Sequence, residues 1–190
     1  MKNIFIKINF IILTSLFINS ISYAESYVAV KDKNYKFFES AKDGDIESLK
    51  KWLDDKKFNI NKTDSKGYTA LIYSAYYGKL NAVNYLLDQG ADPCIEDKRG
   101  NTALLGAIFK GNIAIATKLM FKKCGINQTN NAGQTPMMYA SLFGRKEIAK
   151  KLLENGANIK LKDSMGNDAL TLAESQGNDE MVNIIKKSEK

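Results

Sequence analysis

The sequence predicts a solenoid of repeated structural units, because two sets of glycines recur along it with one common period. The interval between successive members is constant, and it falls in the range of roughly 20–50 residues that indicates a repeat architecture. A threonine lies two residues after each of the first three glycines of the first set, and a leucine or methionine lies four residues after all four. A unit of this size cannot bury its apolar face alone, so we expect stacked units that share one core. The first set is Gly67, Gly100, Gly133 and Gly166, and the second is Gly78, Gly111, Gly144 and Gly177.

Longer motifs surround these glycines. They are G-Y-T-A-L (67–71), G-N-T-A-L (100–104), G-Q-T-P-M (133–137), L-L-D-Q-G-A-D (86–92) and L-L-E-N-G-A-N (152–158). The motifs resemble those of the ankyrin-repeat family, over roughly residues 35–186. The resemblance implies an all-α solenoid of helix-turn-helix units with short turns. It predicts one domain over residues 35–190, with about five repeats including the caps, at approximately 35–63, 64–96, 97–129, 130–162 and 163–190.

The sequence departs from the family's pattern at two positions of the unit. The family's proline is present only as Pro136, and alanine stands at the equivalent positions 70, 103 and 169. The chain has no histidine, although the family commonly uses one for a hydrogen bond that stabilises the turn. We therefore expect somewhat softer turns. The residues at the histidine position are Ile72, Leu105, Met138 and Thr171.

The N-terminal residues predict a secretory signal peptide over residues 1–24. Residues 1–7 contain two lysines and no acid, residues 8–18 are mainly apolar, and Ser22 and Ala24 place small residues before a cleavage site at Glu25. The apolar run is too short to span a bilayer, which needs about 20 residues, so we expect no stable membrane insertion. An uncleaved anchor is the alternative. We expect residues 25–34 to form a short leader, and the mature chain to be a periplasmic or secreted monomer.

The two terminal units are atypical, as expected for the ends of a stack. In the first unit Gly44 separates two helices, each with apolar residues on one face. The last unit keeps the repeat glycines but ends in the polar segment K-K-S-E-K. We expect both units to act as caps. The apolar positions of the first unit are Phe37, Phe38 and Ala41 in one helix and Ile46, Leu49, Trp52 and Leu53 in the other.

Glycine also marks the end of the second helix in two of the three central units. Gly90 and Gly156 follow L-L-D-Q and L-L-E-N, where a left-handed C-terminal cap favours glycine. The unit between them has Lys123, Cys124 and Gly125 in place of Gly-Ala-Asp. We expect the helix cap of that unit to be remodelled.

The composition does not favour catalysis or metal binding. Without histidine the chain lacks the commonest general base and metal ligand, and two cysteines do not make a zinc site. The formal net charge is +7, but the predicted export makes nucleic acid an unexpected partner. Paired lysines late in the second helices complement the helix dipole, with an anionic-surface patch as the alternative. We therefore predict a protein that is not an enzyme and needs no cofactor or metal.

Cys94 and Cys124 occupy the loops that close the second and third repeats. A disulfide between them is favoured by an oxidising compartment, and in the chain-entropy model it contributes about 3–4 kcal/mol. The alternative is two small buried side chains whose Cα atoms lie too far apart, because a bridge needs a separation of about 4.4–6.8 Å. The sequence leaves these alternatives open.

The resemblance places partner-binding residues at the turn tips and on the exposed side of each first helix, which together form a concave face. Rings fall on matching positions of three adjacent repeats and should line up as an aromatic strip with basic residues beside it. Aromatic residues and arginine dominate interface hot spots. The alternative is that some of these rings pack inward between helices. The predicted partner-binding residues are Tyr68, Tyr76, Tyr77, Arg99, Phe109, Lys110, Leu142 and Phe143.

These observations predict a non-enzymatic protein-interaction module of the bacterial periplasm. The resemblance implies that such a module protects or assists a partner protein, or inhibits it as an immunity protein does. A secreted effector that binds a host protein is the alternative. An enzyme would need a pocket with convergent ionisable groups, which a repeat stack rarely forms.

Overall fold

The computed structural model describes residues 34–188, and the chain divides into two compact units, Met1–Lys36 and Phe37–Lys190. The predicted signal peptide and residues 25–33 of the predicted leader lie outside the described residues. Helix α2 (Tyr35–Asp43) crosses the boundary between the units, and the description below concerns the second unit. Over residues 34–188, no helix has the length and apolar character needed to cross a bilayer.

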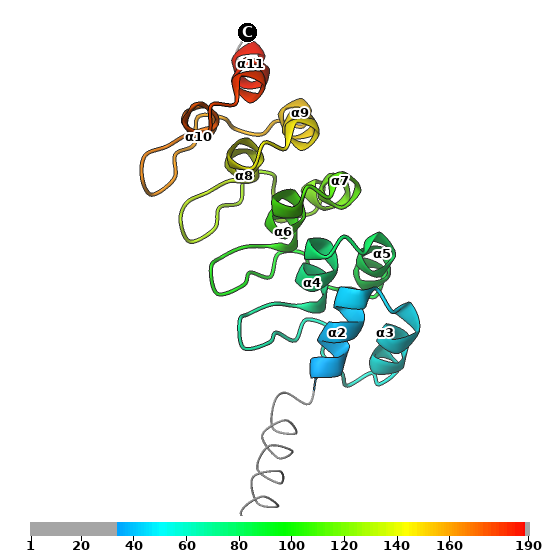
Figure 1. Cartoon of the computed structure of the whole chain (residues 1–190). Coiled ribbons are helices and arrows are strands. Elements are labelled where there is room, and N and C mark those ends of the chain that lie inside the picture. The colour runs from blue at the N-terminus through cyan, green and yellow to red at the C-terminus, as the bar shows by residue number, and fades with distance from the viewer. Residues whose placement is uncertain (1–33, 189–190) are drawn as a thin grey trace, which may run out of the picture. The chain divides into compact units, whose positions relative to one another are not determined.

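The second unit is a stack of antiparallel helix pairs connected by long loops (Figure 1). From α4 onward, the first helix of each pair lies beside the projecting loops, and the second helix lies on the side away from them (Figure 1). The described residues contain helices and no strand, so the predicted all-α repeat fold is confirmed. After α2 the helices are α3 (Ile46–Leu53), α4 (Ala70–Tyr76), α5 (Leu80–Asp88), α6 (Ala103–Lys110), α7 (Ile113–Met120), α8 (Pro136–Leu142), α9 (Lys146–Glu154), α10 (Ala169–Ser175) and α11 (Asp179–Lys187).

The core contains two columns of buried side chains that keep the period of the repeat. In the first helices every member is small and fully buried, which allows neighbouring helices to approach closely. Ser74 fits among alanines because its hydroxyl donates to the carbonyl oxygen of Ala41, at 3.1 Å. The first column is Ala41, Ser74, Ala107, Ala140 and Ala173; the second, in the second helices, is Leu49, Ala82, Ile115, Ile148 and Met181.

Side-chain oxygens hold the turn that precedes each first helix. One Oδ1 atom accepts from two backbone N–H groups, two and four residues further along; Asp97, for example, accepts from Arg99 at 2.7 Å and from Asn101 at 2.9 Å. Thr69 and Thr135 then cap α4 and α8 by accepting from the N–H three residues later. These bonds do not depend on the position where the family has histidine. The turn acids and amides are Asp64, Asp97, Asn130 and Asp163.

Adjacent turn tips are joined by backbone hydrogen bonds, and this contact explains the first three glycines of the first set. The N–H of Lys98 donates to the carbonyl oxygen of Lys66 at 3.0 Å, and the next two junctions repeat the bond. A Cβ atom at Gly67 would lie 2.8 Å from the nitrogen of Lys98, so glycine is required for the close approach as well as for its φ of +85°. Gly166 has no neighbouring atom within 4 Å at its Cβ position, because no further repeat follows it in the described chain.

The cap after α7 is remodelled, as the sequence predicts. After α5 and α9 the chain turns at Gly90 and Gly156, both with positive φ. After α7 the residue with positive φ is Gly125, two positions later in the unit, and its N–H donates to the carbonyl oxygen of Lys122. The loop closing the third repeat therefore differs from its neighbours.

Candidate functional site

A cavity of about 530 Å³ lies between the turn tips and the first helices α4, α6 and α8. Its apolar lining includes Ile72, Leu105 and Gly106, contributed by α4 and α6. Tyrosine and phenylalanine rings line its sides, and Lys66 and Arg99 reach it from two adjacent turn tips. We call this feature the groove.

The rings along the groove form a continuous series of contacts across three repeats, which we call the aromatic row. Tyr76 stacks on Phe109 with ring centroids 5.8 Å apart and an angle of 14° between planes. Phe109 in turn meets Phe143 edge to face at 4.8 Å. Pairs with these geometries stabilise one another beyond the area they bury. In order of contact, the aromatic row is Tyr68, Tyr73, Tyr77, Tyr76, Phe109, Phe143 and Tyr139.

Two tyrosines of the aromatic row are anchored to the turns through their hydroxyl groups. Tyr73 donates to Oδ2 of Asp64 at 2.6 Å, and Tyr139 donates to Oδ1 of Asn101 at 2.9 Å. Burial, followed by the hydrogen bond to Asp64, raises the pKa of Tyr73 above its ordinary value of 10. Burial also raises the pKa of Tyr139. Both hydroxyls therefore stay protonated at neutral pH and tie the first helices to the turn tips.

The charge around the groove is mainly positive. Lys42 lies 4.5 Å from the ring centre of Tyr73, and Lys110 lies 5.0 Å from that of Tyr76. Such cation–π contacts hold positive charge beside the aromatic row. Asp97 is the acidic residue of the lining, and its carboxylate is already occupied by the backbone N–H groups of Arg99 and Asn101.

The structure brings most of the predicted binding residues together. Lys110 lies over the ring of Tyr76 at the edge of the groove, whereas Leu142 is half-buried and packs against the core instead of lining the groove. Sequence reasoning missed Tyr73, Gly106 and Tyr139, which all line the groove. The missed signal was periodic, because all three lie six residues after a glycine of the first set. The predicted residues that line the groove are Tyr68, Tyr76, Tyr77, Arg99, Phe109 and Phe143.

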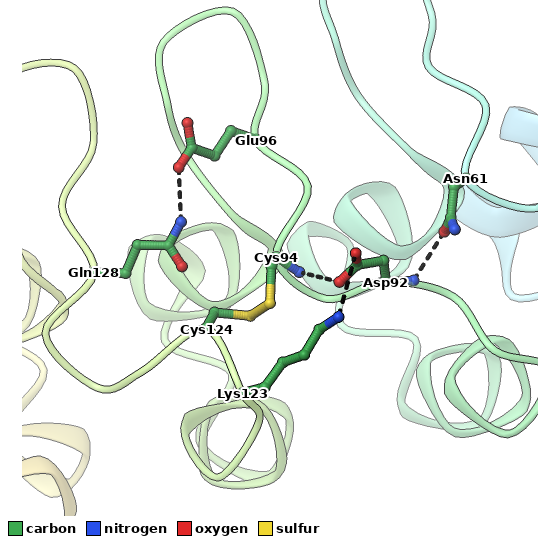
Figure 2. The surroundings of a disulfide bond; sticks show 7 residues. All are labelled: Asn61, Asp92, Cys94, Glu96, Lys123, Cys124 and Gln128. Carbon is green, nitrogen blue, oxygen red and sulfur yellow. Dashed lines mark hydrogen bonds and ion pairs between the residues drawn. A yellow bond between two sulfur atoms is a disulfide. The ribbon is translucent and has the colours of Figure 1, made fainter.

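Cys94 and Cys124 form a disulfide that joins the loops closing the second and third repeats (Figure 2). Their Cα atoms lie 5.1 Å apart, within the range that a bridge needs. Asp92 lies beside the bridge, where its Oδ1 accepts from the N–H of Cys94 at 3.0 Å and its carboxylate pairs with Lys123 at 3.7 Å (Figure 2). Gln128 donates to Glu96 at 2.7 Å and adds a second link between the same loops.

The disulfide takes the place of a hydrogen bond found at the flanking junctions. The Oδ1 atom of Asn61 accepts from the N–H of Asp92 at 2.8 Å, and that of Asn127 accepts from the N–H of Asn158 at 2.8 Å. Cys94 lies one repeat period from each of these asparagines, at the same position of the unit. The middle junction therefore has a covalent link at the position where the two flanking junctions use an asparagine side chain.

Within residues 34–188, no group of three or more histidine, cysteine or acidic side chains is arranged to hold a metal ion. The groove offers aromatic surface, tyrosine hydroxyls and cations, and this set suits binding of a ligand better than proton transfer or nucleophilic attack.

Comparison with known proteins agrees with the architecture. A family model described as ankyrin repeats (3 copies) matches residues 37–130 and 106–190. The human DNA-binding protein RFXANK is 38% identical over 55 residues, which are 29% of this chain and 21% of that protein. Mouse DNA-binding protein RFXANK is 50% identical over 36 residues, or 19% of this chain and 13% of that protein. The chain thus spans about a fifth or less of these relatives. Ankyrin repeats are generally protein-interaction modules and typically non-enzymatic, and this chain belongs to the ankyrin-repeat family.

Proposed function

We propose that the chain is a non-enzymatic module that holds a partner protein in the groove, against the aromatic row. The observation that carries this proposal is the uninterrupted ring contact from Tyr68 to Tyr139 beside a cavity of about 530 Å³. Tyr77 is 51% exposed and Phe109 is 37% exposed, so these rings present apolar area to solvent. Contiguous exposed apolar area on a soluble domain marks an interaction site.

The proposed location is the bacterial periplasm, where the module assists, protects or inhibits its partner. The predicted signal peptide over residues 1–24 supports export, and the disulfide between Cys94 and Cys124 supports an oxidising compartment. DNA binding, which the names of the two relatives state, is not part of the proposal. The aligned segments cover only 21% and 13% of those proteins.

A secreted effector that binds a host protein is the second candidate, because the same signal peptide and groove would serve it. The two candidates differ in where the mature chain accumulates. Fractionation of the producing cells distinguishes them, since a periplasmic module stays in the periplasmic extract and an effector is found in the medium.

The test is capture of partners from periplasmic extract with the immobilised mature chain, residues 25–190, read by mass spectrometry. A groove variant, Tyr76→Ala with Phe109→Ala, should lose the partner and keep its helical content and melting temperature. The matched control is Ile113→Ala with Phe121→Ala, which removes two exposed apolar side chains that do not line the groove. Equal capture by the groove variant and the wild type would contradict the proposal. A collapse in melting would instead assign the rings to the core.

A further inference from the structure

We propose that the groove accepts an acidic segment of the partner that inserts an aromatic side chain over Gly106. This inference rests on the proposed function and specifies the chemistry of the partner. It follows from an interruption in the periodic tyrosines of the groove and from the cations around that interruption.

The periodic tyrosines are interrupted on α6, the middle one of the three first helices α4, α6 and α8. Tyr73 on α4 and Tyr139 on α8 stand one repeat period before and after Gly106 on α6, at the same position of the unit. All three line the groove. Where the flanking repeats place a phenol ring, the central repeat places no side chain, and Gly106 borders the cavity of the groove.

The backbone does not require this glycine. Gly106 lies inside α6 and has no positive φ, unlike the glycines of the turns. A Cβ atom there would meet only the Cβ of Tyr76, at 3.8 Å, which is ordinary van der Waals contact. Glycine is unfavourable in the interior of a helix. Its structural consequence here is open space between rings, which fits an inserted side chain.

The residues around Gly106 favour an aromatic side chain and a negatively charged segment. The aromatic row provides faces and edges for a further ring beside Tyr76 and Phe109. The cations of the lining are Lys42, which is ion-paired with Glu39, together with Lys66 and Arg99. Among the described residues, the side chains of Lys66 and Arg99 make no hydrogen bond or ion pair with another protein group, so they are available to carboxylates. An arginine can bind a carboxylate through two parallel hydrogen bonds.

The test measures binding of short labelled peptides to the full mature chain by fluorescence anisotropy at low salt. The probe is a blocked peptide, Gly-Ser-Asp-Glu-Phe-Asp-Gly-Ser. Three matched peptides replace the acids by their amides, the acids by lysine, or the phenylalanine by alanine. A single-stranded oligothymidylate of similar length tests nucleic acid as the competing ligand, because stacked rings with cations also suit bases.

We expect the acidic aromatic peptide to bind at least tenfold more tightly than each matched peptide and than the oligothymidylate. Gly106→Tyr should weaken this binding at least tenfold by filling the gap. Gly106→Ala should raise the melting temperature and weaken binding several-fold, which separates the role of the gap from folding. Lys66→Gln with Arg99→Gln should reduce the preference for the acidic over the amide peptide to less than threefold.

Equal binding of the four peptides, absence of peptide binding, tighter binding of the oligothymidylate, or unchanged binding by a folded Gly106→Tyr variant would each overturn the inference. The peptide is also added as a competitor in the capture experiment. A partner that is lost with the Tyr76→Ala, Phe109→Ala variant but is not displaced by the peptide would leave the proposed function standing and reject this inference alone. A partner captured equally by all variants would reject both.

Discussion

The junction between the second and third repeats differs from the junctions on either side of it. At the flanking junctions, the amide oxygens of Asn61 and Asn127 accept the backbone N–H of the next closing loop. At the middle junction, Cys94 replaces the asparagine and bonds to Cys124. The N–H of Gly125, the counterpart of the donors at the other junctions, turns back to Lys122.

The difference shows how a repeat stack compensates for one irregular loop. Without glycine at position 123, the loop after α7 cannot form the cap that Gly90 and Gly156 provide. The N–H of Gly125, which an asparagine at position 94 would bind, consequently donates to Lys122 within the same loop. A disulfide needs a suitable separation and direction of its two Cα–Cβ bonds but no free N–H group, so it can join loops of unlike conformation. The joined loop leads into the turn of Asp97 and Arg99, on the groove.

Removal of the disulfide should have the largest effect on the free energy of unfolding. Cys94→Ser with Cys124→Ser should lower the free energy of unfolding by about 3–4 kcal/mol in the chain-entropy model. Urea unfolding of the wild type with and without reductant, beside the double variant, measures this change; the double variant should not respond to reductant. Equal intact masses of alkylated protein with and without prior reduction would show that no bridge forms.

A second test breaks the turn-tip contact of the same junction. Gly67→Ala places a Cβ atom 2.8 Å from the nitrogen of Lys98 and forces a left-handed alanine, so we expect a loss of about 2–3 kcal/mol. Gly166→Ala is the matched control, because its φ is +84° but nothing lies near the added atom. The control should lose only the conformational part, about 1–2 kcal/mol. Equal losses in thermal unfolding would mean that tip contact contributes nothing.

The hydrogen bonds at the flanking junctions should contribute less to stability than the disulfide does. Asn127→Ala removes the acceptor for the N–H of Asn158 and should cost about 1 kcal/mol. Asn127→Asp keeps an oxygen in place and should cost less. Chemical denaturation of the two variants compares them, and amide hydrogen exchange at Asn158 should be faster only in the alanine variant.

The smallest effect concerns the last repeat and depends on pH. Hydrogen bonds from the backbone and side chain of Thr171 lower the pKa of Asp168 below its ordinary value of 3.8, against the opposing effect of burial. A lowered folded-state pKa gives stability that is present above pH 3.8 and lost as the pH falls through the folded value.

Asp168→Asn keeps the cap of α10 but removes the charge. The wild type should therefore lose a few tenths of a kcal/mol more than the variant between neutral pH and pH 3. Melting temperatures across this range provide the measurement, and parallel pH profiles of the two proteins would contradict the expectation.

Most of the fold, and part of the groove, could be predicted from the repeat periodicity. Glycine spacing and the G-x-T-x-L motif place each turn and helix because they reflect local backbone requirements. The rings of Tyr76, Tyr77 and Phe109 could be predicted to share a face for the same reason. Tyr73 and Tyr139 share one repeat position, but a ring at that position is equally compatible with the core until the hydroxyl partners Asp64 and Asn101 are seen.

What the sequence by itself determined is the register: central units of one constant length, helices that begin after the same turn, and an irregular loop at positions 123–125. The tertiary structure decided which side chains meet. Stacking places Gly106 in the lining of the groove, beside Tyr76. It also sets the 5.1 Å between the Cα atoms of Cys94 and Cys124. Both results depend on distances between repeats, and these arise from the packing of neighbouring units rather than from any local preference of the chain.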